Sequence, residues 1–220
     1  MNTMTMLLLL LVASYLTGSF PTSIIVGKIV RGIDIREHGS GNAGGTNVFR
    51  VLGWKPALVV VIVDVFKGWL ATFLYALYLF PGQLTIDQGV IQILCGFTAV
   101  LGHTYTVFAG FRGGKGVGTL AGMLLALYPI VFPLCLTVFV ITLMMSGYVS
   151  LSSIMASVAL PLFLLLLPPL GILQPAPMSL IIFSLLIPWF VVYTHRSNIA
   201  RLREGSENRF EKAMVLRRRK

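Results

Sequence analysis

Residues 102–119 read Gly-His-Thr-Tyr-Thr-Val-Phe-Ala-Gly-Phe-Arg-Gly-Gly-Lys-Gly-Val-Gly-Thr, a polar, glycine-rich stretch between two long apolar runs. Glycine tolerates positive φ angles, and successive amide N–H groups in such a turn can form an anion-binding concavity. The N-terminus of the helix expected from Val117 would present further N–H groups to the same place. Arg112 adds positive charge, and so does a lysine among the glycines. The pattern predicts a phosphate site, with a plain connector between membrane helices as the alternative. The candidate ligands are Gly113, Gly114, Lys115, Gly116 and Thr119.

The stretch is not a nucleotide P-loop. That motif requires Gly-Lys-Ser/Thr after a glycine and four residues, whereas here Gly116 follows Lys115 and Ala109 takes the place of the first glycine. A nucleotide site is therefore not expected.

A second polar segment, residues 27–55, contains Gly-Ser-Gly-Asn-Ala-Gly-Gly-Thr-Asn at positions 39–47. Small hydrogen-bonding side chains on a pliable backbone suit a phosphorylated or polyhydroxy ligand, although a solvated loop of turn residues would have a similar composition. The candidate ligands in this segment are Ser40, Asn42, Thr46, Asn47 and Arg50.

Two further clusters carry chemistry. Asp64 and Lys67 are three residues apart within an apolar run, so they share one helix face, and ionisable groups in a membrane span usually mark a functional site. A structural ion pair is the alternative. After the last apolar run, His195 and Asn198 fall on one stripe if the segment is helical. For His103 the sequence favours a structural role, and His38 is expected to be solvated.

The elements that must position these residues are membrane helices. The chain has 220 residues, of which 56% are hydrophobic and 11% charged, and a mean hydropathy of +0.89, whereas a soluble domain has about a quarter charged residues. The net charge of +10 does not indicate nucleic acid, because the basic residues collect in a few loops and the tail, as in cytoplasmic loops. Cys95 and Cys135 lack metal or disulfide spacing and predict two packed thiols. No metal site is expected.

The predicted fold class is all-α, a polytopic membrane protein with about seven spans, some short or broken, and a single domain over residues 1–220. Pro21 should bend or locally unwind the first span, and Pro81-Gly82 should turn the chain after the second. Charge parity places the N-terminus outside and the basic loops and C-terminal tail in the cytoplasm, with six spans as the alternative. The expected spans are residues 5–26, 56–80, 88–108, 117–127, 130–145, 151–167 and 178–194. The terminal Arg-Arg-Arg-Lys would anchor the chain to anionic lipid.

These segments resemble a known family. Residues 39–47, residues 102–119 and the run His195-Arg-Ser-Asn-Ile-Ala-Arg-Leu are similar to the three signature segments of the bacterial acyl-phosphate:glycerol-3-phosphate acyltransferases, the PlsY family. Residues 64–68 and 148–153 also resemble family segments, in the same order along the chain. Thr106 departs from the family, which commonly has proline there, and this departure puts the geometry leading into the glycine-rich stretch in question.

The resemblance implies an inner-membrane enzyme with a cytoplasmic active site that makes 1-acyl-glycerol-3-phosphate without a cofactor. Its partners would be glycerol-3-phosphate, acyl phosphate and membrane lipid, with no nucleic acid. A monomer is the simplest oligomeric state, which the sequence leaves open. The candidate catalytic residues are Ser40, Lys115, His195 and Asn198, and the candidate substrate ligands are the residues named above together with Lys67.

Several alternatives stay open at this point. His195 would act as general base or would orient the substrate while a phosphate oxygen takes the proton. Lys115 or Asn198 would neutralise the oxyanion, and direct transfer is favoured over an acyl-enzyme on Ser40. An organic-phosphate permease and a non-enzymatic scaffold that binds anionic lipid are the competing functions.

Overall fold

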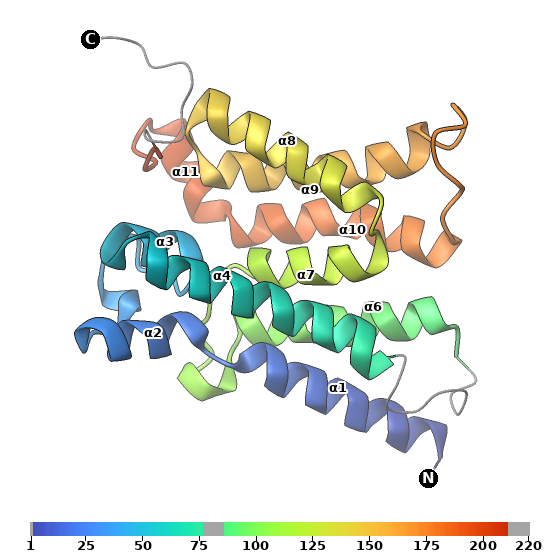
Figure 1. The fold of residues 1–220 in the computed structure, drawn as a ribbon, viewed down its shortest axis with the longest axis horizontal. Coiled ribbons are helices and arrows are strands. Elements are labelled where there is room, and N and C mark those ends of the chain that lie inside the picture. Colours follow the sequence, from blue (N-terminus) through green and yellow to red (C-terminus); the bar gives the residue numbers. More distant parts are fainter. Residues whose placement is uncertain (1, 77–85, 211–220) are drawn as a thin grey trace. The chain divides into compact units, whose positions relative to one another are not determined.

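The structure is a computed structural model that describes residues 2–76 and 86–210, which contain helices and no strand. It divides into two compact units, Met1–Leu127 and Tyr128–Lys220. Each unit is a set of packed helices, drawn in blue to green for the first and in yellow to red for the second (Figure 1).

The first membrane segment is interrupted at Pro21, where the sequence predicts a bend or local unwinding. Helix α1 (Thr3–Ser19) ends just before Pro21, and helix α2 (Thr22–Arg31) begins just after it. Proline has no N–H to continue the helical ladder, so the chain must leave the helix or find other partners for the freed carbonyls. Together the two helices form one apolar segment of 29 residues that is long enough to cross a membrane.

The rest of the first unit alternates long apolar helices with short polar ones. The long helix α4 continues without a gap into a π-helical segment, η2. Its elements are η1 (Ile35–Glu37), α3 (Gly45–Leu52), α4 (Trp54–Trp69), η2 (Leu70–Tyr75), α6 (Gln88–Thr104), η3 (Val107–Ala109) and α7 (Val117–Leu127).

Up to residue 210, the second unit contains three apolar helices and a short polar one. These are α8 (Val131–Ser146), α9 (Val149–Leu166), α10 (Met178–Thr194) and α11 (Arg196–Arg203). Helix α9 packs against both α8 and α10. The chain turns by 63° between α10 and α11 at His195. The segment after the last apolar run is helical, which is the condition under which His195 and Asn198 were expected to share a stripe.

Four of the described helical segments are long and apolar enough to span a membrane, and the bent pair α10–α11 makes a fifth. Helices α7 and α8 are apolar but shorter than a full span. The predicted helix at residues 117–127 coincides with α7, and that at 178–194 coincides with α10. The turn at residues 81–82, the end of the second span at residue 80 and the basic residues 217–220 lie outside the described residues.

Glycines allow the helices of the first unit to touch backbone to backbone, which is how small residues drive helix packing in membranes. A side chain at Gly18 on α1 would begin 2.0 Å from the carbonyl oxygen of Ala99 on α6. A side chain at Gly122 on α7 would begin 1.8 Å from the carbonyl oxygen of Val65 on α4. Figure 1 shows α1 running beside α6 and α4 beside α7.

Both cysteines are buried within their own units as free thiols, which confirms the prediction of packed, unpaired side chains.

We predict that Gly122→Ala lowers the thermal unfolding midpoint in detergent more than Gly118→Ala does, although both residues lie on α7. At Gly122 the new methyl group would meet the backbone of α4, and overpacking of this kind typically costs ~1–3 kcal/mol. At Gly118 the nearest atom is Cβ of Asp64 at 3.0 Å, so a small shift suffices. Alanine also gains ~1 kcal/mol of helix propensity over glycine at either position. Equal midpoints for the two variants would contradict close α4–α7 packing.

Candidate active site

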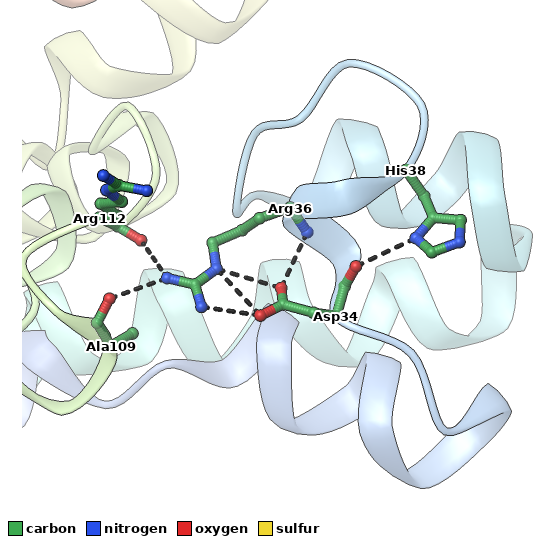
Figure 2. Close-up of polar contacts among 5 residues, drawn as sticks. All are labelled: Asp34, Arg36, His38, Ala109 and Arg112. Carbon is green, nitrogen blue, oxygen red and sulfur yellow. Dashed lines mark hydrogen bonds and ion pairs between the residues drawn. The ribbon is translucent and has the colours of Figure 1, made fainter.

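Arg36 joins the two polar segments of the first unit. Its guanidinium Nη1 donates to the carbonyl oxygens of Ala109 at 2.8 Å and Arg112 at 3.3 Å, in the glycine-rich stretch. The other face of the guanidinium, Nε and Nη2, binds both carboxylate oxygens of Asp34 at 2.7–3.2 Å (Figure 2). Sequence reasoning missed Arg36 because the two carbonyl groups that it binds, at Ala109 and Arg112, are more than seventy residues away along the chain. The bidentate pair with Asp34 holds the guanidinium in the plane that reaches both carbonyls.

The Asp34–Arg36 pair lies in a loop outside the apolar helices and is largely shielded from solvent. Hydrogen bonds from the Arg36 side chain lower the pKa of the Asp34 carboxyl to about 2, against an ordinary value of 3.8. The same bonds raise the pKa of Arg36. Asp34 is therefore ionised whenever the loop is folded at neutral pH. His38, expected to be solvated, is exposed, and its Nδ1 lies 3.1 Å from the Asp34 carbonyl oxygen.

Asn47 shapes the backbone of the first polar segment from inside. Its Oδ1 accepts a hydrogen bond from the N–H of Ser40 at 2.8 Å. Its Nδ2 donates to the carbonyl oxygens of Ile35 and His38, both at 2.9 Å. Because both amide hydrogens are used and the residue is only 1% exposed, Asn47 holds the loop that presents Ser40.

The other candidates from this segment lie around that loop. Ser40 is exposed. Asn42 precedes helix α3 and is half-buried. Thr46 lies in the first turn of α3, and Arg50 lies in its last turn; both are half-buried. The structure thus gathers these four residues on one loop and the short helix that follows it.

Two predicted amide donors of the glycine-rich stretch are already used. The N–H of Gly113 donates to the carbonyl oxygen of Thr104 at 3.0 Å, and that of Gly114 donates to His103 at 3.1 Å. In this conformation these two N–H groups do not form the open anion cradle that the sequence predicts. The glycines serve close packing instead, since a side chain at Gly113 would begin 1.9 Å from the His103 carbonyl oxygen.

Helix α7 begins directly after a glycine with a positive φ angle. Gly116 has a φ of 80°, a conformation that glycine adopts readily, and its carbonyl oxygen accepts the N–H of Leu120. The first-turn N–H groups of a helix lack partners within that helix, and here they follow directly after Lys115. Thr119, by contrast, is fully buried where α7 meets Gly68 of α4. Among the described residues, its hydroxyl has no hydrogen-bond partner.

Asp64 and Lys67 form the ion pair that their spacing predicts, at 2.8 Å, with both side chains buried. The Lys67 ammonium also donates to the carbonyl oxygen of Phe20 at 3.1 Å. Asp64 is approached by the Thr22 hydroxyl at 3.3 Å and by Nδ1 of His103 at 3.5 Å. The structural role favoured for His103 agrees with its burial beside Asp64. These groups line a small polar pocket next to Gly113 and Gly114.

In the second unit, His195 lies at the junction of α10 and α11 and is buried. Its Nδ1 is 2.8 Å from the carbonyl oxygen of Val191. A carbonyl can only accept, so in the neutral imidazole Nδ1 carries the proton and Nε2 carries the lone pair. This tautomer suits a base that acts through Nε2.

Asn198 and Arg201 on α11 share a carboxylate that sequence reasoning missed. Glu207 accepts from Nδ2 of Asn198 at 2.6 Å, from Nε of Arg201 at 2.7 Å and from the Ser150 hydroxyl on α9 at 3.0 Å. Burial of Glu207 raises its pKa, but these three hydrogen bonds outweigh burial, and the net pKa is lowered. The sequence offers little signal for this role, because Glu207 is one of three glutamates among the mixed charges of the tail.

Within residues 2–76 and 86–210, no cluster of three or more His, Cys, Asp or Glu side chains is arranged to hold a metal ion.

We predict that Asp34→Asn lowers the thermal unfolding midpoint at neutral pH and that the difference from the unmodified protein shrinks in acid. A carboxyl whose pKa is depressed on folding contributes stability above its unfolded value, 3.8, and loses it as the pH falls toward about 2. Midpoints measured across this range test the prediction. Glu37→Gln, an exposed acid in the same segment, is the control. A difference for Asp34→Asn that stays constant with pH would contradict the pairing.

The amino-acid sequence is similar to those of known proteins. The family model described as glycerol-3-phosphate acyltransferase matches residues 8–205. Curated proteins named glycerol-3-phosphate acyltransferase include one from Chlorobium chlorochromatii, 43% identical over 92% of this chain and 96% of its own length. Another, from Chlorobaculum tepidum, is 42% identical over 92% of this chain and 95% of its own.

Two solved structures are also similar, both described as PlsY (YgiH), an integral membrane glycerol 3-phosphate acyltransferase. The glycerol 3-phosphate form has a TM-score of 0.79 at 35% identity, and the match covers 93% of this chain and 95% of the chain in that structure. The lysophosphatidic acid form has a TM-score of 0.78 at 33% identity, covering 94% and 97%. With relatives of this identity matched along nearly their whole length, the chain belongs to the glycerol-3-phosphate acyltransferase family.

Proposed function

We propose that this protein transfers an acyl group from acyl phosphate to glycerol-3-phosphate, giving 1-acyl-glycerol-3-phosphate and inorganic phosphate. The observation that carries this proposal is the Arg36 bridge, which ties the loop of Ser40 to the stretch of Lys115. Two segments rich in donors and cations are thereby joined in one unit, as a reaction between two phosphorylated substrates requires. The relatives that bear this activity in their names support the same conclusion.

The reaction requires little from the enzyme beyond the correct positioning of its two substrates. The glycerol hydroxyl oxygen attacks the acyl carbon, the bond from that carbon to the phosphate oxygen breaks, and phosphate leaves with the electron pair. The hydroxyl proton goes to a base or to a phosphate oxygen. Because phosphate is a good leaving group, alignment of the two substrates is the main task, and such alignment can supply ~7–11 kcal/mol of the barrier.

The roles of individual residues follow from their chemistry. Lys115 and the first turn of α7 would bind one phosphate, and Arg50 would bind the other with the polar side chains of its loop, Ser40, Asn42 and Thr46. Lys115 or Asn198 would donate to the oxyanion that develops on the acyl oxygen, an interaction worth ~2.7–4 kcal/mol for one donor. His195, with its Nε2 lone pair, would accept the proton.

We infer a single catalytic domain of seven spans in the bacterial inner membrane, with the N-terminus outside and the site facing the cytoplasm. Helices α7 and α8, although short, would count as tilted or partial spans beside the five longer segments. The distribution of basic residues supports this orientation, since they collect in loops that fall on one side under this count. A monomer suffices for the chemistry proposed.

A permease for organic phosphates is not favoured, because the family model and the relatives are described as acyltransferases. Under the proposed seven-span topology the polar segments lie on one side of the membrane, which favours an enzyme, since a permease needs a polar path through both halves of the bilayer.

We predict that detergent-purified protein forms lysophosphatidate from acyl phosphate and glycerol-3-phosphate with no second compartment present. Acyl-CoA offered in equal amount should remain unconsumed, because the site is built for a phosphate leaving group. Product and both donors are followed by mass spectrometry. No product from acyl phosphate, or an equal rate from acyl-CoA, would contradict the proposal. Protein incubated with donor alone should show no acyl adduct by intact mass, which separates direct transfer from an acyl-enzyme on Ser40.

Lys115→Ala should lower kcat by ~10²–10³-fold if this ammonium stabilises the oxyanion. Lys55→Ala is the matched control, because Lys55 is an exposed lysine at the start of α4. Comparable losses in both variants would point to a general effect of charge rather than to a site at Lys115.

We predict that kcat falls at low pH in the unmodified enzyme because protonation of Nε2 removes the base. His195→Ala should lower kcat by ~10²–10⁴-fold, the usual contribution of general base catalysis, and should abolish the acid limb in the residual activity. The full pH–rate profile of both proteins is the measurement. If the acid limb persists in the variant, a substrate phosphate oxygen, rather than His195, takes the proton.

A further inference from the structure

The break in the first membrane segment exposes backbone carbonyls that need partners inside the apolar part of the chain. Helix α1 ends at Ser19, and Pro21 offers no N–H. The Ser19 carbonyl oxygen accepts the Thr106 hydroxyl, and the Phe20 carbonyl oxygen accepts the Lys67 ammonium. The carbonyl end of a helix carries partial negative charge, so a cation is a favourable cap there. Two side chains from other elements therefore close the end of α1.

The Lys67 ammonium is held by two acceptors within the protein. It is 4% exposed and lies between the Phe20 carbonyl and the Asp64 carboxylate. A charge buried in apolar surroundings is tolerated only when it is paired and hydrogen-bonded, and both conditions are met here. Release of this ammonium toward a substrate phosphate would leave the buried Asp64 carboxylate with only the Thr22 hydroxyl and His103 as polar neighbours. Lys67 is thus poorly suited to be a phosphate ligand.

The same carboxylate reaches the glycine-rich stretch. Nδ1 of His103 lies 3.5 Å from Asp64, and the His103 carbonyl oxygen accepts the N–H of Gly114. A side chain at Gly114 would begin 2.2 Å from Nε2 of His103, so ring and loop are in close contact. The position of the imidazole therefore dictates the path of the backbone immediately before Lys115.

We propose that Lys67 is a positioning residue, a tethered cation that caps the end of α1 and, through Asp64 and His103, sets the backbone from which Lys115 projects. This inference rests on the proposed function, because it assigns Lys67 an indirect part in holding a phosphorylated substrate. Thr106 caps the end of α1 in the same way, since its hydroxyl donates a hydrogen bond to the Ser19 carbonyl oxygen. It stands where the resembling family commonly has proline, which has no hydroxyl to donate.

Kinetics of the purified enzyme test the proposal with three variants. Lys67→Met removes the cation and Asp64→Asn removes the anion, so each cuts the path from α1 to His103. We expect either change to raise KM for at least one of the two phosphorylated substrates by about tenfold, the loss typical of one charged hydrogen bond. The matched control is Lys55→Met, the same substitution at the exposed start of the same helix, for which KM should stay within about twofold of the original.

The double variant Asp64→Asn/Lys67→Met separates positioning from stability. Because it leaves no buried unpaired charge, its thermal midpoint should recover toward that of the unmodified protein even where Lys67→Met alone is too unstable to purify. Its KM should remain raised by the same factor as in the single variants, since both residues act in one path.

Two results would overturn the proposal. If the double variant has the KM of the unmodified enzyme, the Asp64–Lys67 pair contributes to stability and not to positioning. A raised KM in Lys67→Met together with an ordinary KM in Asp64→Asn would make Lys67 a direct phosphate ligand. Failure of the proposed function would look different, because the unmodified enzyme would then form no lysophosphatidate at all.

Discussion

A polar group in hydrocarbon must find a partner within the protein, and this constraint organises the molecule. The break at Pro21 leaves two carbonyls that Thr106 and Lys67 satisfy, and Lys67 in turn requires Asp64. Among the described residues, the buried Thr119 hydroxyl on α7 is an exception, since it has no such partner. The polar chemistry therefore collects between the helices, while the helices themselves touch through glycines and apolar side chains.

Within each unit, hydrogen bonds hold the candidate residues of the proposed site in place. Arg36 spans the first polar segment and the glycine-rich stretch, and Asn47 fixes the loop that carries Ser40. In the second unit, the carbonyl of Val191 sets the tautomer of His195, and Glu207 orients Asn198. None of these holding residues would need to touch a substrate. An acyl phosphate is already activated, so a reaction between two anions gains most from such rigid placement.

The sequence was most informative about features that depend on residues close together in the chain. Apolar length and proline positions gave the bounds of α7 and α10 and the break at Pro21, because helix continuity depends on neighbouring residues. The partners of the Gly113 and Gly114 N–H groups were not predicted, since these groups bond to the carbonyls of Thr104 and His103, nine and eleven residues earlier. Contacts over longer separations, such as that between Arg36 and Ala109, leave no periodic signal. A pattern of glycines predicts that the backbone lies close to another group, but it does not say whether that group is a ligand or another part of the protein.

The central claim is that three polar segments far apart in the chain face the same side of the membrane. Single cysteines at three exposed positions, Glu37, Arg112 and Ser197, in a chain with Cys95 and Cys135 replaced by serine, report this directly. A maleimide that cannot cross the membrane should label all three in inverted inner-membrane vesicles and none in intact spheroplasts. If the cysteine at 197 reacts from the side opposite to the cysteine at 112, His195 and Lys115 cannot serve one site, and the account fails.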